Sequence, residues 1–205
     1  MHAQFATIHR FRKWPQDESE EWGRALVAGL HGFQEPRATL VLGRLDGTDG
    51  AVVALWDESA EAEAAVRSGD DARWLDARVY RVVAHQAGAA GTGKPRFAQV
   101  VWLNAGGGAD RAEAILRAGS ERIAPAVQDV PGVIDTTVLR ADDDSIAVVT
   151  LVTDISVPEA MQRAILASPL LPWQDPAKIN DPDRVDVQRV LDAHLRADVM
   201  AGAGL

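Results

Sequence analysis

Two degenerate copies of one pattern run along the chain, and this repeat limits the possible folds more than any other feature. Residues 5–11 read FATIHRF and residues 97–103 read FAQVVWL, an offset of 97 − 5 = 92 positions. Residues 52–57, VVALWD, are matched by residues 149–154, VTLVTD, at an offset of 154 − 57 = 97. The second copy is therefore longer by 97 − 92 = 5 residues between the matched stretches. Two such units usually pack together and bury apolar surface that neither buries alone.

Composition and charge exclude several classes of protein. With 205 residues and 47% hydrophobic content, the chain can form one large core or two small ones. A net charge of −9 argues against nucleic acid or an anionic membrane as the main partner. The lack of cysteine excludes disulfides and thiolate metal sites. We expect a cytoplasmic protein without a membrane segment, because no cationic start precedes an apolar run and no window reaches roughly 18 apolar residues.

The first copy changes its hydrophobic periodicity in an order that predicts six elements. The sequence DGTDG at residues 46–50 is typical of a hairpin turn between two β-rich runs. We predict a strand at 5–12, a helix at 17–33, strands at 38–45 and 51–56, a helix at 59–67 and a strand at 78–85. This β-α-β-β-α-β order is the split unit of ferredoxin-like folds. The predicted fold class is therefore α+β.

The second copy repeats this order. We predict strands at 96–103, 134–140, 146–153 and 184–190, helices at 110–124 and 156–167, and a terminal helix from residue 191. Asp110 and Ser156 are the expected N-caps of the two helices. Pro125 is expected to end or kink the first helix, because proline removes a backbone hydrogen bond. The small residues of 88–95 predict a linker between a first repeat, 1–87, and a second repeat, 96–205.

A family resemblance lies in the motif that opens the second helix of each copy. Residues 56–62 read WDESAEA, and residues 153–160 read TDISVPEA, where Thr153 replaces the tryptophan. Together with the hairpin before it, this pattern resembles the antibiotic-biosynthesis-monooxygenase type of dimeric α/β-barrel domain. The resemblance implies two ferredoxin-like repeats packed sheet to sheet in one chain, as an intramolecular dimeric barrel. It leaves monomer and homodimer both open.

The resemblance implies no single activity, because the family includes cofactor-free oxidation of aromatic polyketides, haem breakdown, isomerisation and proteins with no known reaction. Its haem-degrading members carry a histidine along the second helix. Neither 59–67 nor 156–167 contains histidine, so we predict no haem breakdown. Without cysteine or a His-x3-His pair, we also predict no metal and no cofactor, with flavin less firmly excluded.

Three motifs resemble ligand sites but favour a simpler interpretation. Residues 88–94 match Gly-x4-Gly-Lys, but Pro95 replaces the hydroxyl residue and a strand follows instead of a helix. The glycines of 106–108 could present amides to an anion, although a slack loop before Asp110 is favoured. The acidic run 142–144 coincides with the hairpin turn of the second copy, so solvated turn residues are favoured over a cation site.

Four residues of the first copy are our candidates for a catalytic site: His9, Arg78, Tyr80 and Arg81. His9 would act as base or hydrogen-bond donor, Tyr80 would assist, and Arg78 or Arg81 would stabilise an anion. The alternative for His9 is a hydrogen-bonded core residue. We expect the larger cavity between the sheet and helices of the first repeat. Apolar residues should fill the equivalent space in the second repeat: Val101, Leu103, Ile165, Leu166 and Leu170.

Two classes of function follow from these residues. The first is a cofactor-independent monooxygenase or a related small-molecule enzyme that acts on an apolar aromatic substrate. In that case a phenol or enol would lose a proton, and the resulting carbanion would react with oxygen. The second is a non-catalytic ligand-binding or interaction protein of the same fold. The sequence alone identifies neither the substrate nor whether the protein is catalytic.

Overall fold

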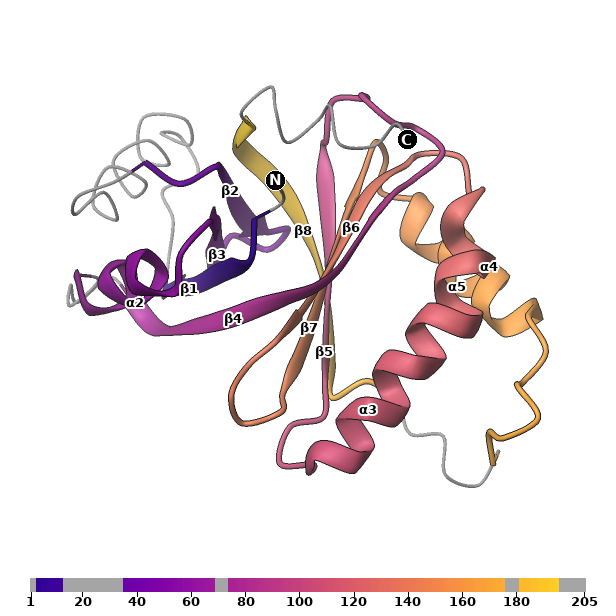
Figure 1. The fold of residues 1–205 in the computed structure, drawn as a ribbon. Coiled ribbons are helices and arrows are strands. Elements are labelled where there is room, and N and C mark those ends of the chain that lie inside the picture. Colours follow the sequence, from indigo (N-terminus) through magenta and orange to yellow (C-terminus); the bar gives the residue numbers. More distant parts are fainter. Residues whose placement is uncertain (1–2, 13–34, 69–73, 176–180, 196–205) are drawn as a thin grey trace. The chain divides into compact units, whose positions relative to one another are not determined.

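The computed structural model describes residues 3–12, 35–68, 74–175 and 181–195, and shows an α+β protein (Figure 1). Its strands are β1 Phe5–Arg12, β2 Ala38–Arg44, β3 Asp49–Trp56, β4 Trp74–Ala87, β5 Phe97–Leu103, β6 Val133–Arg140, β7 Ile146–Val152 and β8 Arg184–Leu195. Its helices are α2 Ser59–Ser68, α3 Ala109–Ala118, the π-helix η1 Gly119–Ile123, α4 Ala124–Gln128 and α5 Val157–Ala167. The predicted helix 17–33 lies outside the described residues.

The strands are hydrogen-bonded in the order β1-β3-β2-β8-β5-β7-β6-β4 of a closed barrel. Around the closed order, β4-β1-β3-β2 and β8-β5-β7-β6 are each the antiparallel order of a ferredoxin-like unit, which confirms the predicted fold class. The chain divides into two compact units, Met1–Val83 with Gln188–Leu205 (unit 1) and Ala84–Val187 (unit 2). The repeat boundaries 1–87, 88–95 and 96–205 stay a prediction.

Unit 1 is built on the hairpin of β2 and β3. Asp46 holds the turn, because its carboxylate accepts hydrogen bonds from the backbone N–H and the hydroxyl of Thr48. Helix α2 packs its alanines on one face of the sheet, against Ala54 and Trp56. This face, which we call the unit 1 helix face, carries alternate residues of the strands: Phe5, Thr7, His9, Phe11, Val52, Ala54 and Trp56.

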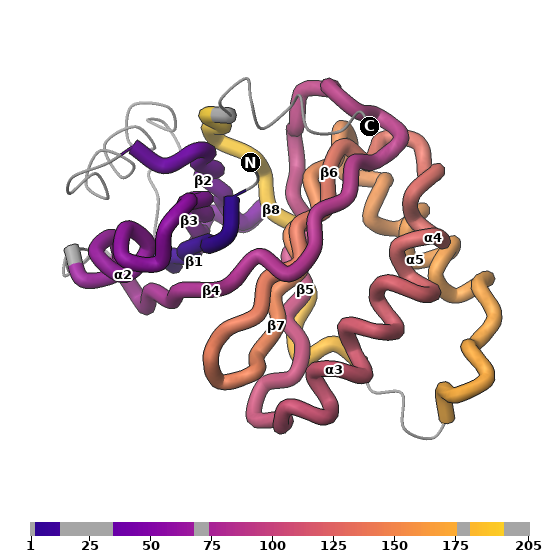
Figure 2. The backbone as a smooth tube through the Cα atoms, viewed as in Figure 1, coloured from indigo at the N-terminus to yellow at the C-terminus, as the bar shows by residue number. Residues whose placement is uncertain are grey.

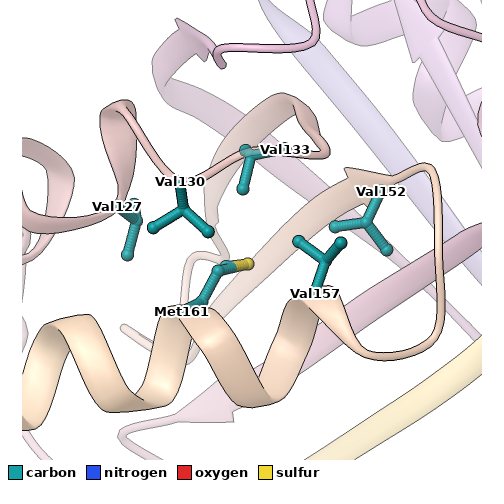
Figure 3. Packing of buried hydrophobic residues seen from close by; sticks show 6 residues of the cluster. All are labelled: Val127, Val130, Val133, Val152, Val157 and Met161. Atoms are coloured by element: carbon teal, nitrogen blue, oxygen red, sulfur yellow. The ribbon is translucent and has the colours of Figure 1, made fainter.

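Unit 2 places α3, α4 and α5 on one side of the sheet of β5, β7 and β6 (Figure 1). A cluster of valines and one methionine fills one end of that face, where residues from α4, α5, β7 and the segment before β6 point toward one another (Figure 3). Its members are Val127, Val130, Val133, Val152, Val157 and Met161. We call this side the unit 2 helix face; it carries Phe97, Gln99, Val101, Leu103, Ile146, Val148, Thr150 and Val152.

Two strands are longer than the sequence predicts. Strand β4 begins at Trp74 instead of residue 78, and Figure 2 lets the reader follow it as one continuous segment to Ala87. Strand β8 continues to Leu195, so the predicted helix from residue 191 is wrong over 191–195. These residues pair with β2, where His194 lies opposite Thr39. Strand pairing therefore overrides the helical tendency of this segment.

The first helix of the second copy also departs from the prediction. Its N-cap is Gly108 without a side-chain cap, so Asp110 lies in the first turn instead. The chain stays helical beyond Pro125, because the π-helix η1 ends just before it and the proline occupies the first turn of α4. In the first turn of a helix the backbone N–H groups have no partner within that helix, so proline is tolerated there. Ser156 is the N-cap of α5, as predicted, but its hydroxyl bonds Asp154 instead of capping the helix.

Candidate functional site

The four predicted site residues lie on two opposite faces of the unit 1 sheet. In the pairing of β1 with β4, Ala77 lies opposite His9, whereas Arg81 lies opposite Phe5. His9 and Arg81 therefore belong to the unit 1 helix face, but four residues of strand, about 13 Å, separate Ala77 from Arg81.

Arg78 and Tyr80 belong to the other face, because they lie opposite Ile8 and Ala6. Side chains alternate along a strand, so neighbours in sequence cannot share a face. The structure thus does not bring the four residues together. His9 and the pair Arg78 and Tyr80 are separate candidates.

His9 is the most unusual of the four in its surroundings. Its side chain is fully buried, and neither ring nitrogen has a hydrogen-bond partner in the structure. The ring of Trp74 lies against it at 5.2 Å between centroids, tilted by 59°. Burial lowers the pKa of His9 to about 4, so the imidazole is neutral at pH 7. A neutral imidazole can both accept and donate a hydrogen bond.

The irregular pairing at the end of β1 brings Trp74 to this position. The register of β1 and β4 shifts between Arg10 and Phe11, and Phe11 then lies opposite Trp74. The rings of Phe11 and Trp74 meet edge to face at 6.3 Å. Such a shift re-aims side chains at a strand end. Two aromatic rings therefore flank the buried base on this face.

The unit 1 helix face is closed around His9, whereas Arg81 at its far end is exposed. Thr7 is fully buried, and its hydroxyl accepts a hydrogen bond of 3.1 Å from the indole N–H of Trp56. Val52 and Ala54 are fully buried as well. Among the described polar side chains of this face, only His9 has all its polar atoms unpaired.

The unit 2 helix face is packed at both ends and partly exposed between them. The valine cluster covers one end. At the other end Arg140 of β6 forms an ion pair with Glu113 of α3, and Ile146 is buried. We call the residues between these ends the middle band: Gln99, Val101, Thr136, Val138, Val148 and Thr150. All except Thr150 are half-buried.

None of the residues predicted from the sequence to form a site belongs to the middle band. The repeat offset places Val101 at the position of His9 and Gln99 at the position of Thr7. Of the five apolar residues expected to fill this half, Ile165 packs against the valine cluster. Val101 and Leu103 are half-buried, and Leu166 and Leu170 are 76% and 41% exposed. The available signal was the polar character of Gln99, Thr136 and Thr150, which lie at matching positions of three strands.

The opposite face of unit 2 carries an ion pair. The Nε2 atom of His85 on β4 lies 2.6 Å from a carboxylate oxygen of Asp135 on β6, and Thr137 also donates to that carboxylate. A register shift between Val133 and Asp135 turns Asp135 to this face. The bond to Asp135 raises the pKa of His85, against a smaller lowering by burial. The pair is partly exposed and holds β4 to β6.

The three motifs that resemble ligand sites lie in turns and loops. The glycines of 106–108 form the loop before α3, with Gly108 as its N-cap. Asp143 accepts hydrogen bonds from the N–H and hydroxyl of Ser145, which is ordinary turn geometry, as predicted. Residues 88–94 form turns that lead into β5 instead of a helix. Within the described ranges, no cluster of three or more His, Asp or Glu side chains could hold a metal ion. Across the same residues, none of the helices has the length and apolar character to span a bilayer.

Comparisons with known proteins identify the fold. No protein-family model matches the chain, and no curated protein matches it either. Among solved structures, it is similar to a Fusobacterium nucleatum protein provisionally described as a monooxygenase, with a TM-score of 0.66, 9% identity and 95% of each chain covered. An anthrone oxidase-like protein gives a TM-score of 0.62 at 11% identity, covering 96% of this chain and 95% of that one.

A third similar structure connects the fold to the resemblance in the sequence. It is a Listeria monocytogenes ferredoxin-fold protein related to antibiotic biosynthesis monooxygenases, with a TM-score of 0.51, 10% identity and 91% and 95% of the two chains covered. These likenesses cover nearly the whole chain. They confirm the dimeric α/β-barrel fold with both ferredoxin-like repeats in one chain.

Proposed function

We propose that the protein is a small-molecule enzyme that oxidises an apolar aromatic substrate with molecular oxygen, and that His9 is its proton acceptor. The observation that carries this proposal is the fully buried imidazole with two unpaired nitrogens. A buried polar group without a partner is costly, so its retention favours a role with a ligand. The similarity to an anthrone oxidase-like protein supports the substrate class.

The proposed reaction requires one proton transfer to His9. A ring nitrogen takes a proton from an acidic methylene or phenol of the substrate, which leaves a delocalised carbanion. Burial disfavours a lone imidazolium, but the adjacent carbanion has the opposite charge and stabilises it. The rings of Trp74 and Phe11 offer flat apolar contacts for an aromatic substrate.

The overall reaction balances without a further reductant. A methylene group and one O₂ give a ketone and one water: the carbon loses two hydrogens, one oxygen atom enters the carbonyl and the other leaves in water. The substrate supplies the four electrons that reduce O₂. The roles of Arg78, Tyr80 and Arg81 stay predictions, since none of them lies beside His9 in the strand register.

The alternative is a non-catalytic ligand-binding protein of the same fold. The full burial of His9 and of its neighbours Thr7 and Val52 favours this alternative, because a substrate would need an opening to reach the imidazole. It also explains why the four predicted residues are not assembled on one face.

Oxygen uptake with anthrone as substrate separates the two functions. The wild-type protein should consume O₂ above the rate of buffer at pH 7. His9→Asn, which keeps a polar side chain of similar size but cannot take up a proton, should lower kcat by about 10²-fold or more. The exposed surface variant Arg163→Gln serves as the control. Equal rates for wild type, His9→Asn and buffer would exclude the proposed reaction.

A further inference from the structure

We infer that the outer side of helix α5 is an interface at which two copies of this chain form a homodimer. The surface consists of the exposed side chains Ile155, Glu159, Arg163 and Leu166 and of the segment that continues to residue 173; we call it the α5 surface. All of it lies in unit 2, so the inference does not depend on the reaction proposed for His9.

The first observation is the amount of apolar side chain that the α5 surface exposes. The inner side of α5 is already packed, because its residues belong to or contact the valine cluster (Figure 3). Eight large hydrophobic side chains are exposed among the described residues, and four of them lie here: Ile155, Leu166, Leu170 and Trp173. Such a concentration in one stretch, unlike single scattered residues, indicates an interaction site.

The second observation is that Trp173 is held in a fixed position at this surface. Its indole N–H donates a hydrogen bond of 3.0 Å to the carboxylate of Glu121. The guanidinium carbon of Arg117 lies 4.4 Å from the centroid of its ring. An ordered side chain loses little conformational entropy when a partner covers it, and tryptophan is enriched among the residues that dominate protein interfaces. This anchor favours a structured protein partner.

The third observation is that the charges of the α5 surface are complementary to themselves. Glu159 and Arg163 form an ion pair one helical turn apart, and their side chains are mostly exposed. In an antiparallel pair of helices related by a two-fold axis, each contact occurs twice with the two residues exchanged. When the axis passes position 161, Glu159 faces the partner's Arg163. A guanidinium has five N–H donors, so Arg163 can hold its own Glu159 and the partner's Glu159 together.

The same arrangement also brings the apolar ends of the α5 surface together. Leu166 lies five residues after position 161, and Ile155 lies six residues before it. Along a helix axis these separations differ by one residue, or about 1.5 Å. Leu166 therefore faces the partner's Ile155 when Glu159 faces the partner's Arg163. Because one two-fold arrangement satisfies the charged and the apolar contacts, a second copy of this chain is the occupant that fits.

The charge balance argues against other occupants. Helix α5 carries one carboxylate and one guanidinium, although the whole chain has a net charge of −9. An anionic membrane or a strongly charged protein would be attracted by an excess of one sign, which α5 lacks. A second copy needs only the pairing of these two charges.

Sedimentation velocity over a range of protein concentrations tests the homodimer. A helix of 11 residues with one flanking segment gives a small interface, so the wild type should dimerise with a Kd of about 1–100 μM. Arg163→Glu should raise the Kd at least about tenfold, because like charges then face each other. Leu166→Asp should raise it by about the same factor, because a charge replaces an apolar contact.

A charge exchange and a matched control make the test specific. Arg163→Glu combined with Glu159→Arg should return the Kd to within about threefold of the wild type, because each carboxylate again faces a guanidinium. Arg67→Glu makes the same change in the exposed pair of Arg67 with Glu63 on α2, and should leave the Kd unchanged. Circular dichroism checks that every variant folds.

The outcomes decide the inference separately from the proposed reaction, because no substrate is present. A wild type that stays monomeric up to about 0.5 mM would overturn it. A dimer with the same Kd in Arg163→Glu and Leu166→Asp would also overturn it, since the interface would then lie elsewhere. If Leu166→Asp does not fold, recovery or further loss of affinity in the charge exchange decides.

Discussion

The helix faces of the two units differ at equivalent positions of the repeat. In unit 1, β1 presents Thr7 and His9, and both are fully buried. In unit 2, β5 presents Gln99 and Val101 at these positions, and both are half-buried. The titratable residue His9 is therefore enclosed in unit 1, whereas the corresponding Val101 of unit 2 is partly accessible.

A second difference, in the residue at the end of β3 or β7, accompanies this one. A tryptophan at the end of β3 fills unit 1 and satisfies Thr7 through its indole N–H. By strand register, unit 2 has Val152 at that position, one residue before the Thr153 that the sequence motif aligns with Trp56. Val152 is smaller than tryptophan and cannot donate a side-chain hydrogen bond. The same fold therefore encloses His9 in one half and leaves Gln99 half-buried in the other. Four predictions test this contrast.

Removal of the tryptophan should have the largest effect. We expect Trp56→Ala to lower the free energy of unfolding by about 3–5 kcal/mol, because it opens a cavity against Ala62 and Ala65. The matched change Val152→Ala should cost about 2 kcal/mol, since fewer buried methyl groups are lost. Urea unfolding measures both. Equal losses would show that the two ends are packed alike.

The pH dependence of stability should reveal the buried histidine. The pKa of His9 is lowered to about 4 in the folded protein, below its ordinary value of 6.5. The contribution of the neutral, buried imidazole to the free energy of unfolding is therefore fully present above pH 6.5. About 3 kcal/mol of it is lost as the pH falls toward 4.

Urea unfolding at pH 7 and at pH 4 compares wild type with His9→Val, which copies the residue of unit 2. His9→Val should lack the loss of stability that protonation of His9 causes between pH 7 and pH 4. The reciprocal variant Val101→His places a histidine at a half-buried position and should titrate closer to 6.5, as followed by NMR. Identical pH profiles for wild type and His9→Val would contradict the burial of a neutral His9.

The matched positions Thr7 and Gln99 should respond differently to loss of their polar groups. Thr7→Val leaves the indole N–H of Trp56 buried without its acceptor, and should cost about 2 kcal/mol. Gln99→Leu should change the free energy of unfolding by less than about 0.5 kcal/mol, because Gln99 is half-buried. Thermal unfolding of both variants measures the difference. A larger loss for Gln99→Leu would mean that the middle band is closed.

The smallest effect should come from His85, whose pKa shifts in the direction opposite to that of His9. Asp135 raises the pKa of His85, so the stabilisation is fully present below pH 6.5 and is lost as the pH rises through the folded value. Because the pair is partly exposed, we expect less than about 1 kcal/mol. Asp135→Asn should remove the dependence between pH 6 and pH 8 in urea unfolding. A wild-type profile in that variant would rule out this pair as its source.

Much of the architecture could be predicted from local patterns. The turn at residues 46–50 and the strand at 5–12 follow from turn chemistry and from the two-residue period of a strand, and the structure confirms both. The extent of β4 and β8 could not be predicted in this way. Their additional residues are strand only because β1 and β2 pair with them.

The candidate site shows the same division. The residues His9 and Tyr80 could be chosen from their types, but their placement on opposite faces depends on the register of β1 with β4. A register shift of one residue would move every side chain of a strand to the other face. The unpaired nitrogens of His9 and the half-buried middle band are likewise results of packing, which no local pattern contains.

By itself, the sequence determined that the chain is a doubled β-α-β-β-α-β unit, because periodicity, turn residues and the repeat offset are properties of neighbouring residues. Tertiary structure alone decided that the two copies differ. Trp56 bonds Thr7 across the sheet in unit 1, whereas Val152 joins a valine cluster at one end of unit 2. His9 is enclosed beside Trp74, and Gln99 is half-buried. Burial depends on residues that are distant in the chain and meet only in the folded protein.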